Sequence, residues 1–153
     1  MFRTLGIAAS GLSAQRTRLD VIASNIANAE TTQVDANGGA YQRQVARMEA
    51  RGNPWQPYEV GPTGQPAEFR LPSGNPLDAM HGVNVAAIEA DQTEGPLVYE
   101  PGHPNADENG YVRYPNVRIT DELVDLMDAR RVYEANATVF QSAKSMLRRA
   151  IDI

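Results

Sequence analysis

Residues Ile119–Ile151 read ITDELVDLMDARRVYEANATVFQSAKSMLRRAI. From Ile119, alternating steps of four and three give a nearly continuous apolar series that only Arg130 and Lys144 interrupt: Ile119, Leu123, Leu126, Arg130, Tyr133, Ala137, Phe140, Lys144, Leu147 and Ile151. This is a heptad stripe, and no proline or glycine breaks it, so the stretch predicts one continuous helix. Such a helix cannot cover its own apolar stripe, so it requires a partner.

The charges at the two ends of this stretch agree with a helix. Thr120 is a plausible N-cap, and acidic residues follow it, while Lys144, Arg148 and Arg149 lie near the end. Both biases complement the helix macrodipole. For Arg130 and Lys144 two roles stay open: they set the register of an assembly, or their stems pack while their charged ends reach water.

A second stripe with the same spacing lies near the N-terminus: Leu5, Ala8, Leu12, Gln15, Leu19, Ile22, Ile26 and Ala29. Gly6 and Gly11 each cost about 1 kcal/mol of helix stability relative to alanine, so we expect the firmest helix from Leu12 to Ala27. An ordinary surface helix on a globular core fits this period too. Because both ends of the chain carry such stripes, we expect an antiparallel pair with coiled-coil packing.

The middle of the chain has a different character, because all ten prolines lie between Pro54 and Pro115. Such a stretch cannot be helical for long. It predicts a turn at 37–39, strands at 41–48 and 82–88, a short strand near 69–71, and a hairpin of 97–99 with 111–114 around a loop at 101–110. The predicted fold class is α+β, an antiparallel N- and C-terminal helical coiled coil (1–32 and 116–153) with a small, irregular β-rich insertion (33–115) as an outer domain.

Charge and composition exclude several classes of protein. The net charge is −5, and there is no basic face of the kind that neutralises phosphates, so nucleic acid is not an expected partner. The chain has no cysteine, which rules out disulfides and thiolate metal sites. No apolar run approaches the ~20 residues of a transmembrane helix, and the glycine-broken N-terminus does not fit a cleaved signal peptide.

Little in the sequence points to chemistry. His103 lies on a proline-rich turn near Asp107 and Glu108, which is thin support for a metal-dependent hydrolase. Residues 105–110 fit the opening of a calcium loop, but Asn116 stands where the bidentate glutamate is needed, so a solvated hairpin tip is favoured. No serine has a plausible histidine neighbour. We therefore expect no enzyme, no cofactor and no bound metal.

Apolar residues off the main stripes, among them Val21, Val132 and Val139, favour lateral packing with further copies. From the residues alone, this is a self- or co-assembling structural protein. A cytoplasmic coiled-coil adaptor or binding module is the alternative, and it requires helical ends that are stable in the dilute monomer. The residues expected to carry assembly are Leu5, Leu12, Leu19, Ile22, Ile26, Ile119, Leu123, Leu126, Tyr133, Phe140, Leu147 and Ile151.

Several motifs also carry a resemblance. Residues 10–15 (SGLSAQ) and 19–32 (LDVIASNIANAETT) are similar to the N-terminal signature of bacterial flagellar axial proteins. Residues 38–44, 98–104, 110–117, 133–136 and 143 to the end resemble the proximal-rod members of that family. Five polar or aromatic residues belong to these motifs: Asn25, Asn28, Tyr133, Glu134 and Asn136.

The resemblance implies a structural subunit of the proximal rod, the drive shaft that joins the membrane ring to the distal rod and hook in the periplasm. It implies terminal helices packed around the export channel, a β domain outside, and no catalytic residues. The implied partners are copies of the chain, other rod proteins, membrane-ring proteins and proteins beside the export gate. Uncleaved export through the flagellar type III apparatus and unfolded ends in the monomer are also implied.

Overall fold

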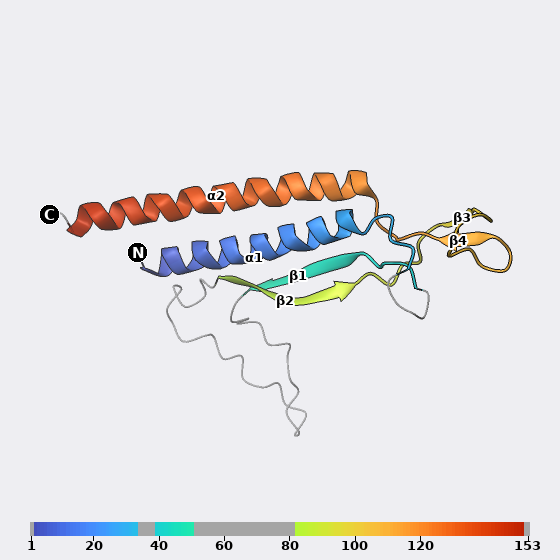
Figure 1. The fold of residues 1–153 in the computed structure, drawn as a ribbon. Helices are drawn as coiled ribbons and strands as arrows, with labels where there is room; N and C mark the ends of the chain where they lie inside the picture. The colour runs from blue at the N-terminus through green and yellow to red at the C-terminus, as the bar shows by residue number, and fades with distance from the viewer. Residues whose placement is uncertain (1, 34–38, 51–81, 152–153) are drawn as a thin grey trace, which may run out of the picture.

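The computed structural model describes residues 2–33, 39–50 and 82–151, which form two helices and four short strands. Figure 1 shows three layers: helix α2 (Ile119–Ile151), helix α1 (Phe2–Ala27) below it, and the hairpin of β1 (Gln44–Ala50) and β2 (Val83–Ala90) below α1. The second hairpin, β3 (Leu97–Tyr99) with β4 (Tyr111–Arg113), extends beyond the end of α1. This confirms an α+β chain with a helix at each end and a small antiparallel insertion.

Helix α2 has the bounds that its sequence predicts, Ile119 to Ile151. Acidic Asp121 and Glu122 occupy its first turn and basic Arg148 and Arg149 its last, as the macrodipole favours. The predicted N-cap is wrong by position, because Thr120 already lies inside the helix. The first turn closes on the Arg118 carbonyl oxygen, which accepts hydrogen bonds from the amides of Asp121 at 3.0 Å and Glu122 at 3.1 Å.

Helix α1 begins at Phe2, ten residues before the predicted firm start at Leu12. The reason is tertiary contact, which outweighs the low helix propensity of glycine. Gly11 is buried, and a Cβ added to it would lie 2.9 Å from Nδ2 of Asn136 on α2. The missing side chain at Gly11 is therefore what allows the two helices to approach each other there.

Strands β1 and β2 pair antiparallel along the side of α1 that faces away from α2. They overlap the strands predicted at 41–48 and 82–88, each shifted toward its C-terminal end, and the register changes at a bulge between Arg47 and Met48. Ser10 of α1 ties this layer on, since its hydroxyl accepts a hydrogen bond from the Val83 amide at 3.0 Å. The turn predicted at 37–39 lies mostly, and the strand near 69–71 wholly, outside the described residues.

Strands β3 and β4 form the predicted hairpin, with Val98 paired to Val112. Its loop is held by Asp107, whose Oδ1 accepts hydrogen bonds from the amides of Asn109 at 2.9 Å and Tyr111 at 2.8 Å. Gly110 has a positive φ of 82°, which favours glycine. Residues 105–110 are thus a hairpin tip between strands, not the opening of a helix–loop–helix calcium site.

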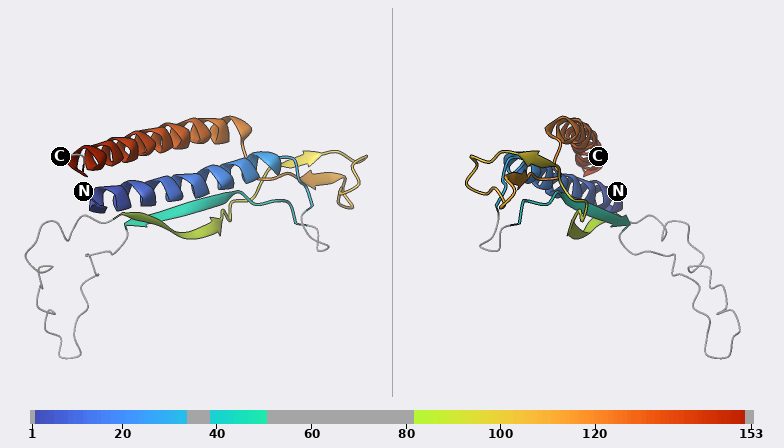
Figure 2. Two further views of the ribbon diagram at one scale, coloured as in Figure 1. Left: turned by 60° about the vertical axis from the view of Figure 1, so that its left-hand side comes forward. Right: turned by 90° about the vertical axis from the view of Figure 1, so that its right-hand side faces the viewer.

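The buried apolar core of the described residues is small and rich in alanine: Ala8, Ala14, Val21, Ile22, Tyr41, Val112, Ala129 and Ala143. Figure 2 shows that the molecule is elongated, with both chain ends at the same end of the helix pair. Most of the apolar side chains of α2 are not part of this core. In the single chain, α1 is therefore largely covered by the other elements, whereas much of the surface of α2 is exposed.

Candidate assembly interface

Helices α1 and α2 run antiparallel in one continuous register. Asn25 of α1 contacts Glu122 of α2, and two heptads away Gly11 of α1 meets Asn136 of α2. Both helices therefore advance by two heptads between these two contacts.

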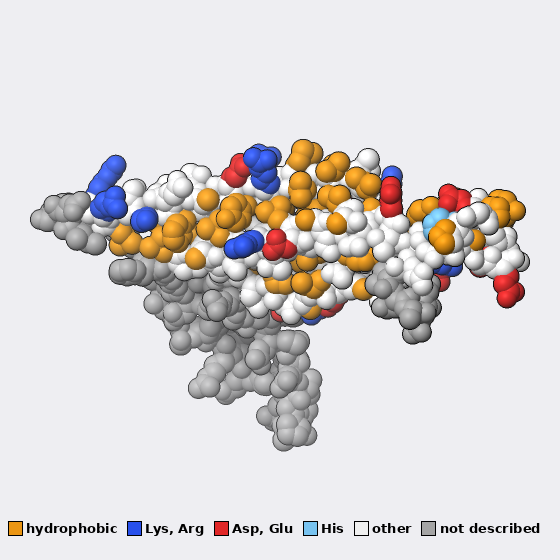
Figure 3. Space-filling model, viewed as in Figure 1, with side chains coloured by type: hydrophobic (Ala, Val, Ile, Leu, Met, Phe, Trp, Pro, Cys, Tyr) orange, Lys and Arg blue, Asp and Glu red, His pale blue; other side chains and the backbone are white. Residues whose placement is uncertain are grey.

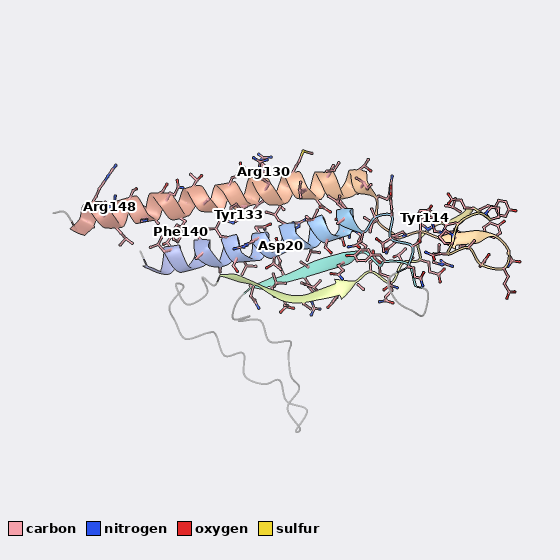
Figure 4. The ribbon with its side chains drawn as sticks, in the orientation of Figure 1. Asp20, Tyr114, Arg130, Tyr133, Phe140 and Arg148 are labelled. Carbon is pink, nitrogen blue, oxygen red and sulfur yellow. The ribbon has the colours of Figure 1, made fainter. Side chains whose placement is uncertain are left out.

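The residues of α2 that lie nearest α1 follow a heptad pattern that differs at some positions from the predicted stripe. Glu122, Ala129 and Ala143 are buried and Asn136 is half-buried, whereas Ile119 and Leu123 are exposed. The predicted residues Leu126, Phe140 and Leu147 are half-buried, and Tyr133 is exposed at its edge. In Figure 4, Tyr133 and Phe140 lie on the side of α2 toward α1, while Arg130 and Arg148 extend away from it. The side chain of Ile151 is outside the described residues.

On α1 the predicted stripe is more deeply placed. Ile22 is buried, and Leu5, Leu12, Leu19 and Ile26 are half-buried. The helix is covered by α2 on one side and by β1 and β2 on another. Six of its exposed residues form one narrow face of small and polar side chains: Ala9, Ser13, Arg16, Asp20, Ala23 and Ala27.

Asn25 is the point where three elements meet. Its side chain is 1% exposed, and its Nδ2 donates to the Gln44 carbonyl oxygen at 2.9 Å and to Oε2 of Glu122 at 3.1 Å. Its Oδ1 accepts from the Gln44 amide at 2.9 Å and from the Tyr41 hydroxyl at 3.0 Å. All four hydrogen-bonding positions of the amide are used. Asn25 thereby fixes the start of β1 and the start of α2 to the end of α1.

Four charged side chains complete this site. Glu122, 0% exposed, accepts from Nε of Arg43 at 2.6 Å, and Asp125 accepts from Arg43 at 3.2 Å and from Arg18 at 3.1 Å. The two acids and two bases balance, so no net charge is buried. Asn25 was singled out from its motif, but Arg18, Arg43 and Glu122 were not. The two partners are 79 residues apart in the sequence in the Arg43–Glu122 pair and 107 residues apart in the Arg18–Asp125 pair. Nothing local in the sequence reveals such pairing.

The other motif residues have local roles. Asn28 ends α1, because its Nδ2 donates to the Ser24 carbonyl oxygen at 2.9 Å and its Oδ1 accepts from Thr31 at 3.2 Å. Glu134 pairs with Arg130 on the exposed surface of α2 at 2.9 Å. Lys144 is also exposed. Neither Arg130 nor Lys144 is buried in the single chain.

The outer surface of α2 is an uncovered apolar face. Its exposed large hydrophobic residues are Ile119, Leu123, Val124, Met127, Val132, Val139 and Met146. Figure 3 shows hydrophobic side chains gathered over the half of α2 that follows β4. Exposed apolar patches on soluble proteins are typical of surfaces that contact another protein, a membrane or a ligand.

His103, which the sequence analysis considered for chemistry, lies in a local turn. Nδ1 of His103 accepts a hydrogen bond from the Asn105 amide at 3.1 Å, within the turn of the hairpin loop. Among residues 2–33, 39–50 and 82–151, no group of three or more His, Asp or Glu side chains could hold a metal ion. Within the same ranges, neither helix has the length and apolar character needed to cross a bilayer. A half-open groove of about 380 Å³ beside the Asn25 site is lined by charged and apolar side chains of α1, β1 and α2.

Comparison with known proteins confirms the resemblance seen in the motifs. The family model for flagella basal body rod proteins matches residues 5–33, and that for the C-terminal region of flagellar basal body rod FlgEFG proteins matches residues 108–153. The chain is 41% identical to the flagellar basal-body rod protein FlgC of Borreliella burgdorferi, across 100% of this chain and 97% of the relative. It is 37% identical to FlgC of Bacillus subtilis (99% and 97% covered) and 37% identical to FlgC of Salmonella typhimurium (96% and 92%). The chain therefore belongs to the FlgC family of flagellar basal-body rod proteins.

Proposed function

We propose that this chain is a structural subunit of the proximal rod of the flagellar basal body, where it assembles helically with copies of itself and with other rod proteins. Full-length similarity to FlgC proteins supports a structural role in the basal-body rod. The observation that carries the assembly is the outer face of α2, which is apolar and uncovered in the single chain.

The physical reason is the imbalance between core and surface. The described residues bury eight hydrophobic side chains, four of them alanine, and leave fourteen large ones exposed. Each Val- or Leu-sized side chain gains about 1.5–3 kcal/mol when it is fully buried. Burial of this face between subunits therefore drives association, and with so small a core we expect the chain to gain order on assembly.

In the assembled rod, α1 and α2 act as an antiparallel coiled coil that encloses the export channel, and residues 33–115 form the outer part of the subunit. The continuous register from Asn25–Glu122 to Gly11–Asn136 supports this arrangement. The rod transmits torque through packing and polar contacts, with no chemical step. The remaining proposed partners are membrane-ring proteins and proteins near the export gate. The chain itself reaches them by export without cleavage.

The test replaces Leu126 or Phe140, both half-buried on the α1 side of α2, by aspartate in the bacterium. A carboxylate there opposes packing of the helix pair. We expect loss of completed rods in electron micrographs of basal bodies and loss of motility. Asn109→Asp, exposed at the tip of the β3–β4 hairpin and away from the outer face of α2, is the control and should leave rods intact. Normal rods in both core variants would contradict the proposal.

A further inference from the structure

The β3–β4 hairpin stands apart from the rest of the chain. Its two strands pair only with each other among the strands that the structure describes, and each has three residues. Figure 1 and Figure 2 show the hairpin beyond the end of the helix pair. An isolated two-stranded hairpin is at best marginally stable in water, and a third strand or a packed helix gives it independent stability.

The outer edge of β4 is already closed. The Tyr111 amide donates to Oδ1 of Asp107 at 2.8 Å, and the Tyr111 carbonyl oxygen accepts from the Asp107 amide at 2.9 Å. Both backbone groups of Tyr111 therefore point away from β3 and are in use. A further strand cannot pair with β4 at this position.

The outer edge of β3 is open. The Glu100 amide donates to the Gly110 carbonyl oxygen at 2.9 Å, across the hairpin. In an antiparallel pair, residues bonded in this way alternate with residues whose backbone N–H and C=O point outward. The outward residues of β3 are therefore Leu97 and Tyr99. Within the part of the chain that the structure describes, no residue outside the hairpin forms a backbone hydrogen bond with these groups.

Strand β3 also lacks side chains that protect a free edge. Charged residues and bulges discourage pairing with another chain, and β1 has Arg47, Glu49 and a bulge after Arg47. Strand β3 consists only of leucine, valine and tyrosine. Leu97 is 56% and Tyr99 63% exposed, and residues two apart in a strand lie on the same face. An added strand can therefore gain apolar contacts beside the open backbone groups.

We propose that a strand of a different basal-body protein, with lysine or arginine beside it, pairs with the outer edge of β3. This contact rests on the proposed function and specifies one partner surface. Backbone hydrogen bonds to Leu97 and Tyr99 supply the pairing, and their side chains supply the apolar contact.

Charge around β3 selects this partner. Residues 94–113 contain four acidic residues and one basic residue, a net charge of −3: Glu94, Glu100, Asp107, Glu108 and Arg113. A second copy that paired through β3 would bring the same negative charge to the contact, and like charges across paired strands are destabilising. A strand flanked by basic residues complements the hairpin instead.

Photo-cross-linking in basal bodies tests the contact. The probe is p-benzoyl-phenylalanine, placed at position 97 of the full chain in exchange for Leu97. Irradiation should join it to one segment of another basal-body protein, identified by mass spectrometry, and that segment should carry lysine or arginine close to the joined residue. The same probe at Ala86, exposed on β2, is the control and should not capture that segment.

Two substitutions at Tyr99 separate backbone pairing from side-chain contact. Tyr99→Ala removes the ring, whereas Tyr99→Pro removes the ring and the outward N–H. The hydrogen bonds between β3 and β4 do not use this N–H, and proline is tolerated at such edge positions. With the probe at position 97, Tyr99→Pro should give roughly 3–10-fold less cross-linked product than Tyr99→Ala, as expected for one lost hydrogen bond. Amide exchange at Glu100 checks that the hairpin is intact in both variants.

Glu108→Lys tests the charge, since Glu108 is exposed at the hairpin tip. It should lower the yield of the same product. Should Tyr99→Pro not enter basal bodies, this variant decides, and an unchanged yield overturns the proposal.

Equal yields from Tyr99→Pro and Tyr99→Ala would show that the backbone edge is not what binds, and would overturn the proposal. A joined peptide from a second copy of this chain overturns it too. Basal bodies that contain the probe but give no product overturn the contact and leave the rod role intact. Absence of the unmodified chain from basal bodies overturns the proposed function instead.

Discussion

Asn25 and Glu122, 97 residues apart in sequence, are joined by a buried hydrogen bond of 3.1 Å between Nδ2 and Oε2. The same amide also pairs with both backbone groups of Gln44. One side chain therefore couples the helix pair to the first strand of the insertion. Displacing α2 by one residue would leave Asn25 and Glu122 without this partner in an interior that has little water. The apolar stripe alone allows α2 to pair with α1 in more than one register, and this contact selects one of them.

Asn25→Asp tests this coupling. The substitution preserves shape but places a second carboxylate against Glu122 and removes the donor to Gln44. We expect a loss of about 3 kcal/mol or more in the free energy of unfolding, because a buried polar pair is broken. The measurement is urea unfolding followed by circular dichroism, under conditions where both helices are formed.

Glu122→Gln in the Asn25→Asp background is the control for that mechanism. The glutamine amide can donate to the new aspartate, so the double variant should lose less than the sum of the two single losses, with a coupling of about 0.5–3 kcal/mol. Additive losses would mean that the two side chains do not act on each other, and that shape alone explains the effect.

Gly6→Ala and Gly11→Ala separate helix propensity from packing. Nothing lies within 4 Å of a Cβ added at Gly6, whereas at Gly11 the added atom meets Nδ2 of Asn136 at 2.9 Å. Gly6→Ala should therefore stabilise α1 by up to about 1 kcal/mol. Gly11→Ala should gain less or lose stability, and Asn136→Ala should restore the gain by making room. Equal gains at the two glycines in thermal unfolding would contradict close helix contact at Gly11.

The sequence predicts α2 to the residue because three signals agree over Ile119–Ile151: apolar period, charge at both ends and no helix breaker. It does not give the phase of that helix. Two different heptad patterns contain Leu126, Phe140 and Leu147. The alternate positions are Leu123 and Arg130 in one pattern, and Glu122 and Ala129 in the other. In the structure the small residue Ala129 faces α1, and the larger Leu123 is left for another partner.

The start of α1 and the Asn25 site also depend on distant residues. Gly11 opposes a helix by its local propensity, and only the contact with Asn136 explains why the helix continues through it. The local sequence explains Glu122 only as a charge that complements the helix dipole, although its main partners are Arg43 and Asn25. Such assignments need the tertiary fold, since periodicity contains no information on which residues meet.

Gly110→Ala should weaken the β3–β4 hairpin. The residue has φ of 82°, and an added Cβ would lie 3.0 Å from Cε2 of Tyr99. A left-handed conformation costs a residue with a side chain about 1–2 kcal/mol. We expect amide hydrogen exchange at Glu100, which bonds to the Gly110 carbonyl oxygen, to accelerate by roughly 5–30-fold. Gly102→Ala, with nothing within 4 Å of its added Cβ, is the control and should leave exchange unchanged.

Tyr114, labelled in Figure 4 near the junction of the hairpin with α2, should titrate at unusually high pH. Its hydroxyl donates to Oε2 of Glu100 at 3.1 Å, and this hydrogen bond, then burial and the Glu100 charge, raise the pKa of Tyr114 above its ordinary 10.0. A raised pKa in the folded state means that the contact stabilises the fold fully below the unfolded pKa. That stabilisation is lost as the pH rises through the folded pKa. Phenolate absorbance, with Tyr114→Phe used to assign the signal among six tyrosines, measures the shift. Glu100→Gln should lower the midpoint of Tyr114, and an unchanged midpoint would show that Glu100 is not its cause.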